Sequence, residues 1–90
     1  MRGETHHLKT WPTFFEEVVQ GRKTFEVRLD DRGFEVGDLL HLEEWDPQTK
    51  SFTGRDTTRL VTYLLRGNGY AVQRDFVVMA IAPAEGKEST

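Results

Sequence analysis

Four side chains that could do chemistry lie within six residues of one another in the first third of the chain. They supply an ammonium, a hydroxyl, a carboxylate and a guanidinium group, from Lys23, Thr24, Glu26 and Arg28. Between residues 24 and 29 they alternate with Phe25, Val27 and Leu29, and a period of two is typical of a β-strand. We expect the apolar face of this strand to pack in a core and the polar face to line a binding site.

Lys23 and Glu26 are the two candidates for direct chemistry. The carboxylate could position the ammonium, or one of the two groups could polarise a bound water. An adjacent carboxylate favours the charged form of a lysine, which suits ligand binding better than nucleophilic attack. The alternative interpretation is a structural ion pair at a sheet edge, which contributes about 0–1 kcal/mol when exposed.

Two arginines could contact the same ligand. Arg28 presents a fork of donors that suits a phosphate or a base edge. Its competing role is an ion pair with Glu26, Asp30 or Asp31. Arg32 is open to the same two interpretations because it follows Asp31 directly.

Three aromatic residues are candidates for stacking on a nucleobase. Trp45 ends a predicted strand beside a loop, where partial exposure is expected, and it is the preferred stacking residue. Tyr63 lies within a predicted strand and could face either side. Trp11 belongs to the apolar stripe of a predicted helix, so a core position is expected for it.

The element that precedes the polar strand is predicted to be a helix over residues 12–20. Pro12 suits the first turn of a helix, where its missing N–H is not needed. Gly21 suits the left-handed residue that ends one. Apolar residues recur at the spacing of a helix that packs on a core, namely Trp11, Phe14, Phe15 and Val18.

The remaining elements are predicted to be strands. Alternation, β-branched residues and a continuous apolar run place them at residues 6–10, 24–29, 39–45, 57–65 and 76–82. A hairpin loop is expected at residues 46–50, and Gly54 suggests a bulge or a bend in the strand that returns from it. One helix with about five short strands favours an α+β domain whose mixed sheet is curled or barrel-like.

Length and composition restrict the class of protein. Ninety residues suit a single domain with one modest core. We expect residues 6–82 to be ordered and residues 83–90 to form a disordered tail. No apolar run is long enough to span a membrane and no signal peptide is recognisable, so a cytoplasmic location is expected. The net charge of −3 argues against indiscriminate binding to nucleic acid.

Metal ions and cofactors are not expected. The chain has no cysteine, which excludes disulfides and thiolate zinc sites. His6 and His7 are adjacent in a predicted strand and therefore point to opposite faces. Together with His41 they form no motif of known ligand spacing. No phosphate-binding glycine loop is present either.

The residues around the polar strand resemble a known family. Gly21, Lys23, Glu26 and Arg28 match the G-x-K-x-x-E-x-R signature of ASCH domains, small β-barrels of the PUA-like superfamily. Three further motifs resemble a small uncharacterised bacterial and phage family within that group. They are His6-x-Leu8-Lys9, Asp31-Arg32-x-Phe34-x-Val36-Gly37-Asp38 and Thr53-Gly54. The similarity covers about residues 6–81.

The resemblance implies a mixed β-barrel with the N-terminal helix packed at one end and a cleft lined by the signature. It also implies a nucleic-acid or nucleotide ligand, since PUA-like domains commonly bind RNA. One ASCH branch hydrolyses N4-acylated cytidine, using the signature lysine to activate a threonine three residues later. That position holds Glu26 here, and residues 67–74 form a short loop where the branch has a helix with an assisting glutamate.

The sequence therefore predicts a domain that binds a short single-stranded RNA segment or a nucleoside-like molecule. The expected contacts come from Lys23, Thr24, Glu26, Arg28, Arg32 and Trp45. One alternative is an amidohydrolase acting on an N4-acylated cytidine, with Lys23 and Glu26 as the working pair. A second alternative is a protein-interaction module that uses an exposed strand edge.

Overall fold

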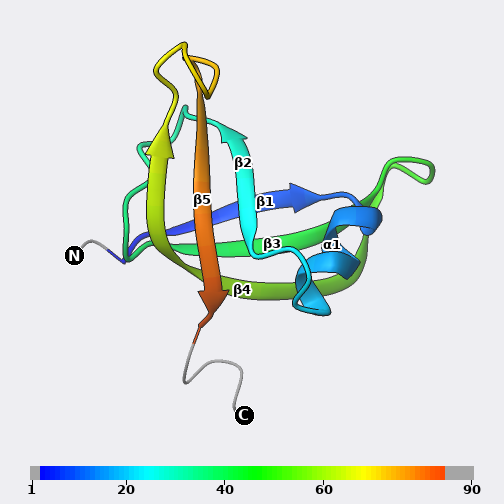
Figure 1. Cartoon of the computed structure of the whole chain (residues 1–90). Coiled ribbons are helices and arrows are strands. Elements are labelled where there is room, and N and C mark those ends of the chain that lie inside the picture. Colours follow the sequence, from blue (N-terminus) through cyan, green and yellow to red (C-terminus); the bar gives the residue numbers. More distant parts are fainter. Residues whose placement is uncertain (1–2, 85–90) are drawn as a thin grey trace.

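The computed structural model describes residues 3–84 as a five-stranded sheet with one short helix. In chain order the elements are β1 (Thr5–Thr10), α1 (Pro12–Val19), β2 (Phe25–Leu29), β3 (Leu39–Asp46), β4 (Ser51–Arg66) and β5 (Phe76–Pro83). The strand order is β1-β3-β4-β5-β2, with β1 parallel to β3 and the other pairs antiparallel. The sheet curls into a half-barrel (Figure 1). The predicted order of helix and strands is confirmed.

The two edges of the half-barrel are β1 and β2, and no backbone ladder joins them. Arginine side chains connect them instead. Nη2 of Arg28 donates to the carbonyl of Lys9 at 2.9 Å, and Nη1 of Arg32 donates to the carbonyl of His7 at 3.0 Å. Carbonyls two residues apart point to the same side of a strand, so both lie on the free edge of β1. The seam between β1 and β2 is thus bridged by two side chains.

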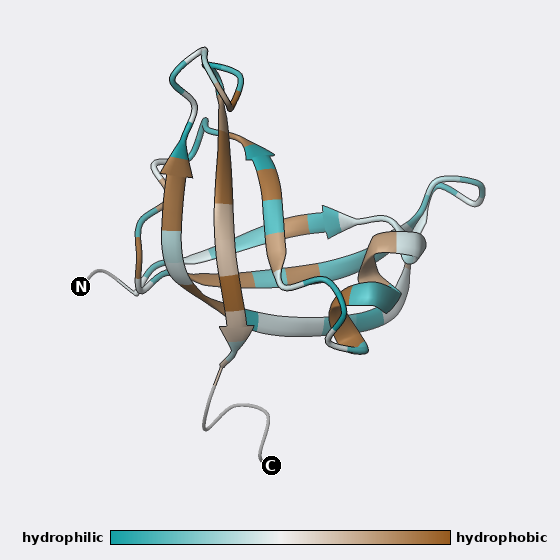
Figure 2. Ribbon diagram, in the orientation of Figure 1, coloured by the Kyte–Doolittle hydropathy of each residue, from teal (hydrophilic) through white to brown (hydrophobic). Residues whose placement is uncertain are grey.

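The core fills the concave side of the sheet. Its members are Leu8, Phe15, Val18, Phe34, Leu40, Leu42, Val61, Val77, Met79 and Ile81. Alternate residues of β1, β3 and β5 point into it, as the period of two requires. Figure 2 shows β5 as almost entirely hydrophobic, whereas hydrophilic and hydrophobic residues alternate along β2.

The helix α1 contributes only part of its predicted apolar stripe to this core. Phe15 and Val18 are each 1% exposed, but Trp11 and Phe14 are about half exposed. The expectation of a core position for Trp11 is therefore wrong. The helix is short and packs chiefly on β3, so its contact face is narrower than the stripe. Gly21 follows its end at φ 82°, the left-handed conformation expected there.

The strand β4 is longer than predicted, because the return from the hairpin and the next strand form one continuous element. Gly54 lies inside it at φ 98°. The register between β3 and β4 shifts at this point, between the Glu43–Asp56 and Trp45–Phe52 pairs. The predicted bulge is therefore present, and it allows one long strand to curve around the half-barrel.

The orientation of β2 is the reverse of the prediction. Glu26 is 3% exposed, whereas Phe25, Val27 and Leu29 are each nearly half exposed. Glu26 lies opposite the buried Met79 of β5, so the polar face of β2 points toward the inside of the half-barrel. The apolar face lies on the outside, where Val27 and the outward residues of β5 line a second hollow. Alternation predicts two different faces but does not say which one is buried.

The ends of the described segment also differ from expectation. β5 runs through Pro83, and Ala84 is buried, where a tail was expected to begin. The rest of the expected tail, residues 85–90, lies outside the described residues. Among residues 3–84, no helix has the length and apolar character needed to cross a membrane.

Candidate functional site

A cleft of about 510 Å³ lies at the seam between β1 and β2. The end of β1, the first turns of α1 and the start of β2 form its walls. Its lining residues are Lys9, Thr10, Trp11, Phe14, Lys23, Phe25, Glu26, Val27 and Arg28. Lys23, Glu26 and Arg28, predicted from the sequence, meet in this cleft.

Glu26 is the buried centre of an ion-pair network. One carboxylate oxygen lies 3.2 Å from Nζ of Lys23 and the other lies 3.2 Å from Nε of Arg28. Lys23 also donates to the backbone carbonyl of Phe25 at 2.7 Å. Both cations are partly exposed while the carboxylate is almost fully buried, so the positive groups form the surface of the network.

Three aromatic rings surround this network. Trp11, Phe14 and Phe25 are 53%, 51% and 45% exposed. Nζ of Lys23 lies 4.9 Å from the centre of the Phe25 ring and 5.8 Å from that of Phe14, which is within range of a cation–π interaction. The cleft therefore combines apolar ring faces with one buried acceptor group and the two cations that pair with it, and Lys9 adds a third cation to its lining.

Other predicted site residues lie outside the cleft. The Thr24 carbonyl accepts a hydrogen bond from the Ile81 N–H, and its side chain does not line the cavity. Arg32 bridges the seam and lies 4.0 Å from a carboxylate oxygen of Asp31, which fits its structural interpretation. Trp45 lies on the outward face of β3, where Nζ of Lys9 is 4.5 Å from the centre of its ring.

The sequence does not predict the aromatic residues that line the cleft, although Trp11 is one of the three stacking candidates. Trp11 and Phe14 were assigned to the core because they share the helical period of Phe15 and Val18. Phe25 was assigned to the core because the polar face of β2 was expected to point outward. One signal was available for Trp11, because it precedes Pro12, which marks the first turn of the helix, and therefore lies outside the helix itself.

Two glutamates of α1 form ion pairs with arginines outside the helix. Arg22 donates to Glu17 at 2.7 Å, and this hydrogen bond lowers the pKa of Glu17 below its ordinary value. Hydrogen bonds from Gln20 and Arg55 lower the pKa of Glu16. The Arg55 contact at 3.2 Å joins α1 to β4, while the guanidinium lies 4.9 Å from the centre of the Phe15 ring. These pairs help to fix the position of the helix that follows Trp11 and contains Phe14.

The described residues also contain two groups of potential metal ligands. Glu4, His6 and Asp38 form a largely buried group, in which Glu4 is exposed, and His7, His41 and Glu43 form one on the outward face. In the buried group, Oδ2 of Asp38 lies 2.8 Å from Nε2 of His6 and accepts from the Glu35 N–H at 3.0 Å. Those contacts give it a structural role in the turn that precedes β3.

Comparison with known proteins places these features in a family. The model of a family described as "Domain of unknown function (DUF3850)" matches residues 5–81. A protein of Escherichia phage P2, described as "Uncharacterized 12.9 kDa protein in GpA 3'region", is 37% identical over 62 residues. The aligned stretch covers 69% of this chain and 55% of the phage protein.

Proposed function

The chain belongs to the DUF3850 family, and from that premise we propose that its seam cleft binds an unpaired nucleobase, in a short RNA segment or a nucleoside-like molecule. We also propose that the half-barrel is of the PUA-like, ASCH type. The G-x-K-x-x-E-x-R residues support this assignment, because three of them meet in the cleft. The mixed curled sheet with one N-terminal helix is the architecture that the resemblance implies.

One observation carries the proposal, namely the exposed aromatic rings beside a buried, ion-paired carboxylate. Half-exposed rings of Trp11, Phe14 and Phe25 offer stacking surfaces, and a stacked base contributes about 1–3 kcal/mol. Large apolar rings that remain this accessible next to charged groups suit a flat ligand that is polar at its edge.

The carboxylate and the cations would read the edge of that ligand. Each oxygen of Glu26 accepts one charged donor and retains a further lone pair, which suits the exocyclic amino group of a base. The contacts of Arg28 within residues 3–84 use Nε and Nη2, so Nη1 is available to donate to a phosphate or a carbonyl.

The overall charge supports recognition of few nucleotides. A chain with net charge −3 does not attract a long polyanion, and the cleft supplies only two cations of the signature. Specificity would then come from stacking and base-edge contacts, as in the recognition of single-stranded RNA.

An NMR titration of the labelled protein tests the proposal. The probes are nucleosides and short single-stranded RNAs, and the amides of residues 21–29 are followed in the wild type, Phe14→Ala and Tyr63→Ala. Tyr63 is 65% exposed outside the cleft and serves as the matched control. We expect saturable shifts and a loss of about tenfold or more in affinity for Phe14→Ala only, from the stacking contribution.

Equal affinities of Phe14→Ala and Tyr63→Ala for the same probe would contradict the stacking role of the cleft. No shift with any probe would contradict nucleobase binding altogether. The exposed apolar face of β2 would then become the best candidate surface, as a protein-interaction role requires. In that case Lys23→Ala and Glu26→Gln would leave partner binding unchanged.

Hydrolysis is a second candidate function, favoured by the Lys23–Glu26 pair at 3.2 Å in the cleft. In that reaction water adds to the acyl carbon of an N4-acylated cytidine, the C–N bond breaks, and the nitrogen takes up a proton. Lys23 donates to two acceptors, so its position suits polarising the acyl oxygen more than attacking the carbon. Incubation with N4-acetylcytidine separates the two functions, since only hydrolysis gives cytidine and acetate, and Lys23→Ala would abolish it.

A further inference from the structure

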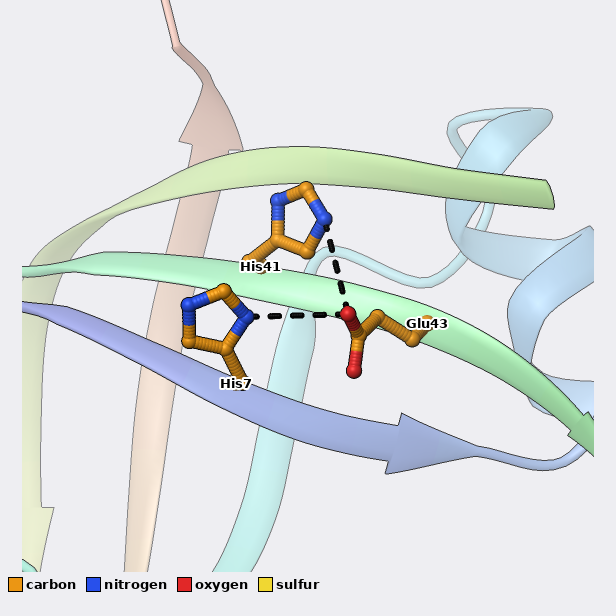
Figure 3. A group of neighbouring side chains, drawn as sticks. All are labelled: His7, His41 and Glu43. Carbon is orange, nitrogen blue, oxygen red and sulfur yellow. Dashed lines mark ion pairs between the residues drawn. The ribbon is translucent and has the colours of Figure 1, made fainter. Parts of the chain in front are cut away.

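The outward face of the half-barrel brings together two histidines and a carboxylate that lie far apart in the sequence. His7 comes from β1, and His41 and Glu43 come from β3. The parallel register places His7 directly beside His41, with their ring centres 5.1 Å apart. Figure 3 shows both rings directed toward the same carboxylate oxygen. The cluster lies on the opposite face of these strands from the core.

The distances within this cluster do not fit hydrogen bonds. Nδ1 of His7 lies 3.6 Å from Oε2 of Glu43, and Nε2 of His41 lies 3.9 Å from the same oxygen. A hydrogen bond between nitrogen and oxygen typically spans about 2.7–3.2 Å. One oxygen is therefore shared between two imidazole nitrogens without bonding closely to either.

The same distances approach those between ligands of one metal ion. Zinc binds histidine nitrogen and carboxylate oxygen at about 2.0–2.2 Å in tetrahedral geometry. Two ligand atoms of such a tetrahedron lie about 3.3–3.6 Å apart, by the same bond lengths. The two nitrogen–oxygen separations of the cluster, 3.6 and 3.9 Å, are at or slightly above that range, and all three ligand atoms lie within 4.8 Å of one another.

A fourth ligand is available from the neighbouring strand. Asp56 of β4 lies directly opposite Glu43, and its Oδ2 is within hydrogen-bond distance of Nε2 of His41, at 3.1 Å. Two histidines and two carboxylates from three adjacent strands thus lie on one patch of the surface, where His7, His41 and Glu43 form the compact group and Asp56 contacts His41. The two carboxylates contribute a charge of −2, which complements a divalent cation.

His41 is also oriented as a metal ligand would be. Its Nδ1 lies 3.2 Å from the hydroxyl of Thr58, the residue opposite it on β4. If Nδ1 carries the hydrogen and donates to Thr58, Nε2 carries a lone pair that faces Asp56, and this arrangement requires a cation between the two groups. Metal-binding histidines commonly have such a partner on the second nitrogen, which sets the tautomer. A hydrogen on Nε2 would form a hydrogen bond with Asp56 alone, whereas a metal ion bound to Nε2 would also be coordinated by Glu43 and His7.

We propose that His7, His41 and Glu43, with Asp56 as the fourth ligand, bind a divalent transition metal, and that Zn²⁺ is the ion best suited to the site. Imidazole nitrogen favours zinc and its neighbours in the first transition row, whereas calcium and magnesium prefer oxygen ligands. The ion would tie the edge strand β1 to β3 and β4. It would stabilise the fold through its preference for the folded state. The site is independent of the seam cleft and of the function proposed for it.

The test is a competition titration of the protein, prepared without a polyhistidine tag, against a zinc-binding dye. The wild type is compared with His41→Ala, Glu43→Gln and the control Glu35→Gln, which removes an equal charge from a carboxylate paired with Arg66. We expect one zinc ion per chain and a loss of affinity of at least about tenfold in the first two variants, since even outer-shell changes cost that much. The control should bind zinc as the wild type does.

A second readout follows the histidine rings by NMR during the same titration. Resonances of His7 and His41 should shift, while those of His6, held by Asp38 inside the fold, should not. A folded spectrum of each variant shows that lost affinity does not reflect unfolding. Unchanged zinc affinity in both His41→Ala and Glu43→Gln, or shifts at His6 instead of His7 and His41, would overturn the proposal. So would the absence of binding at millimolar zinc.

Discussion

Glu26 has an unusual environment for a carboxylate on an edge strand. It is 3% exposed, and its two oxygens accept from Lys23 and Arg28. A buried charge is tolerated only when its partners compensate for the loss of water. The two cations would repel each other without it, so this residue keeps the walls of the cleft together. The burial of Glu26 could not be predicted from residue types alone, because the same residues could also form an exposed ion pair.

Replacement of Glu26 by Gln should therefore destabilise the protein. The amide keeps the size of the side chain but leaves two neighbouring cations without their shared counter-charge. We expect the free energy of unfolding to fall by about 2 kcal/mol, the scale of hydrogen bonds to charged groups. Urea denaturation measures the change. Glu35→Gln is the control, because exposed pairs contribute little and should change stability by less than about 0.5 kcal/mol. Equal effects in the two variants would refute this account.

Glu17 gives a prediction about pH. The hydrogen bond from Arg22 lowers its pKa, so ionised Glu17 stabilises the fold above its unfolded pKa. This contribution is lost as the pH falls through the lowered pKa of the folded state. In Arg22→Gln the pKa of Glu17 should rise toward its ordinary value, and the acid side of the stability profile should become less steep.

Carbon-detected NMR of the glutamate carboxyls measures this change directly. Glu16 is the internal control, because hydrogen bonds from Gln20 and Arg55 are the main causes that lower its pKa. Its titration should change far less than that of Glu17 in Arg22→Gln. Added salt should reduce the wild-type shift of Glu17, since exposed pairs are screened. A Glu17 titration that is identical in the two proteins would contradict the assignment.

At the scale of elements, β2 explains why the site is where it is. As an edge strand it has a ladder on one side only, and its polar residues turn toward the seam. Arg28 uses this position to reach the carbonyl of Lys9 on the other edge. The seam thus remains open to a ligand while two arginines keep its walls in register. A closed backbone ladder between β1 and β2 would leave no room for the cleft.

The bulge in β4 provides a prediction at the same scale. Gly54 adopts φ 98°, where an L side chain is strained, although no atom within 4 Å would meet an added Cβ. Gly54→Ala should cost about 1–2 kcal/mol through backbone strain alone. The melting temperature should fall by several degrees, at about 4–8 °C per kcal/mol for a domain of this size.

The control for this variant is Gln48→Ala in the exposed hairpin loop, which should change the melting temperature little. A Gly54→Ala protein as stable as the control would show that the strand has another way to bend. Because the space around Gly54 is open, a loss of stability could not be attributed to a clash.

At the scale of the whole molecule, charge limits the kind of nucleic acid that could bind. The chain carries −3 overall, and the cleft offers the two signature cations Lys23 and Arg28 to an anionic ligand, while Lys9, which also lines it, lies over the ring of Trp45. If RNA binds there, log K should fall with log salt at a slope of about −1.4, from two contacts at about −0.7 each. Lys23→Gln should reduce the slope by about 0.7.

Affinity measurements with a short single-stranded RNA at several salt concentrations give this slope. A much steeper dependence would mean that phosphates contact a wider basic surface, such as the arginines of β4 and the following loop. A slope unchanged by Lys23→Gln would place the contact outside the cleft. Either result would contradict the proposed mode of binding.

The sequence by itself determined the elements and their order. The helical period before Gly21, the alternation of β2, the turn residues and the apolar run of β5 each depend on neighbours a few residues apart. Such patterns act through local backbone preferences, so they can be recognised without a partner strand. The bulge at Gly54 belongs to the same class. So does the meeting of Glu26 and Arg28, because residues two apart on one strand share a face. Lys23 lies before β2 and reaches the same carboxylate from the segment that leads into the strand.

Only the tertiary structure decided which face of β2 is buried and which other residues line the cleft beside it. Burial depends on how β2 pairs with its neighbour in the sheet, and that neighbour, β5, lies about fifty residues along the chain from β2. For the same reason Trp11, Phe14 and Phe25 entered the cleft, while Arg32 and Trp45 took positions elsewhere. The pairing of His7 with His41 follows from the register of two parallel strands, which no local pattern encodes. Long-range contacts are chosen by the packing of the whole sheet, and they determine what its surfaces can bind.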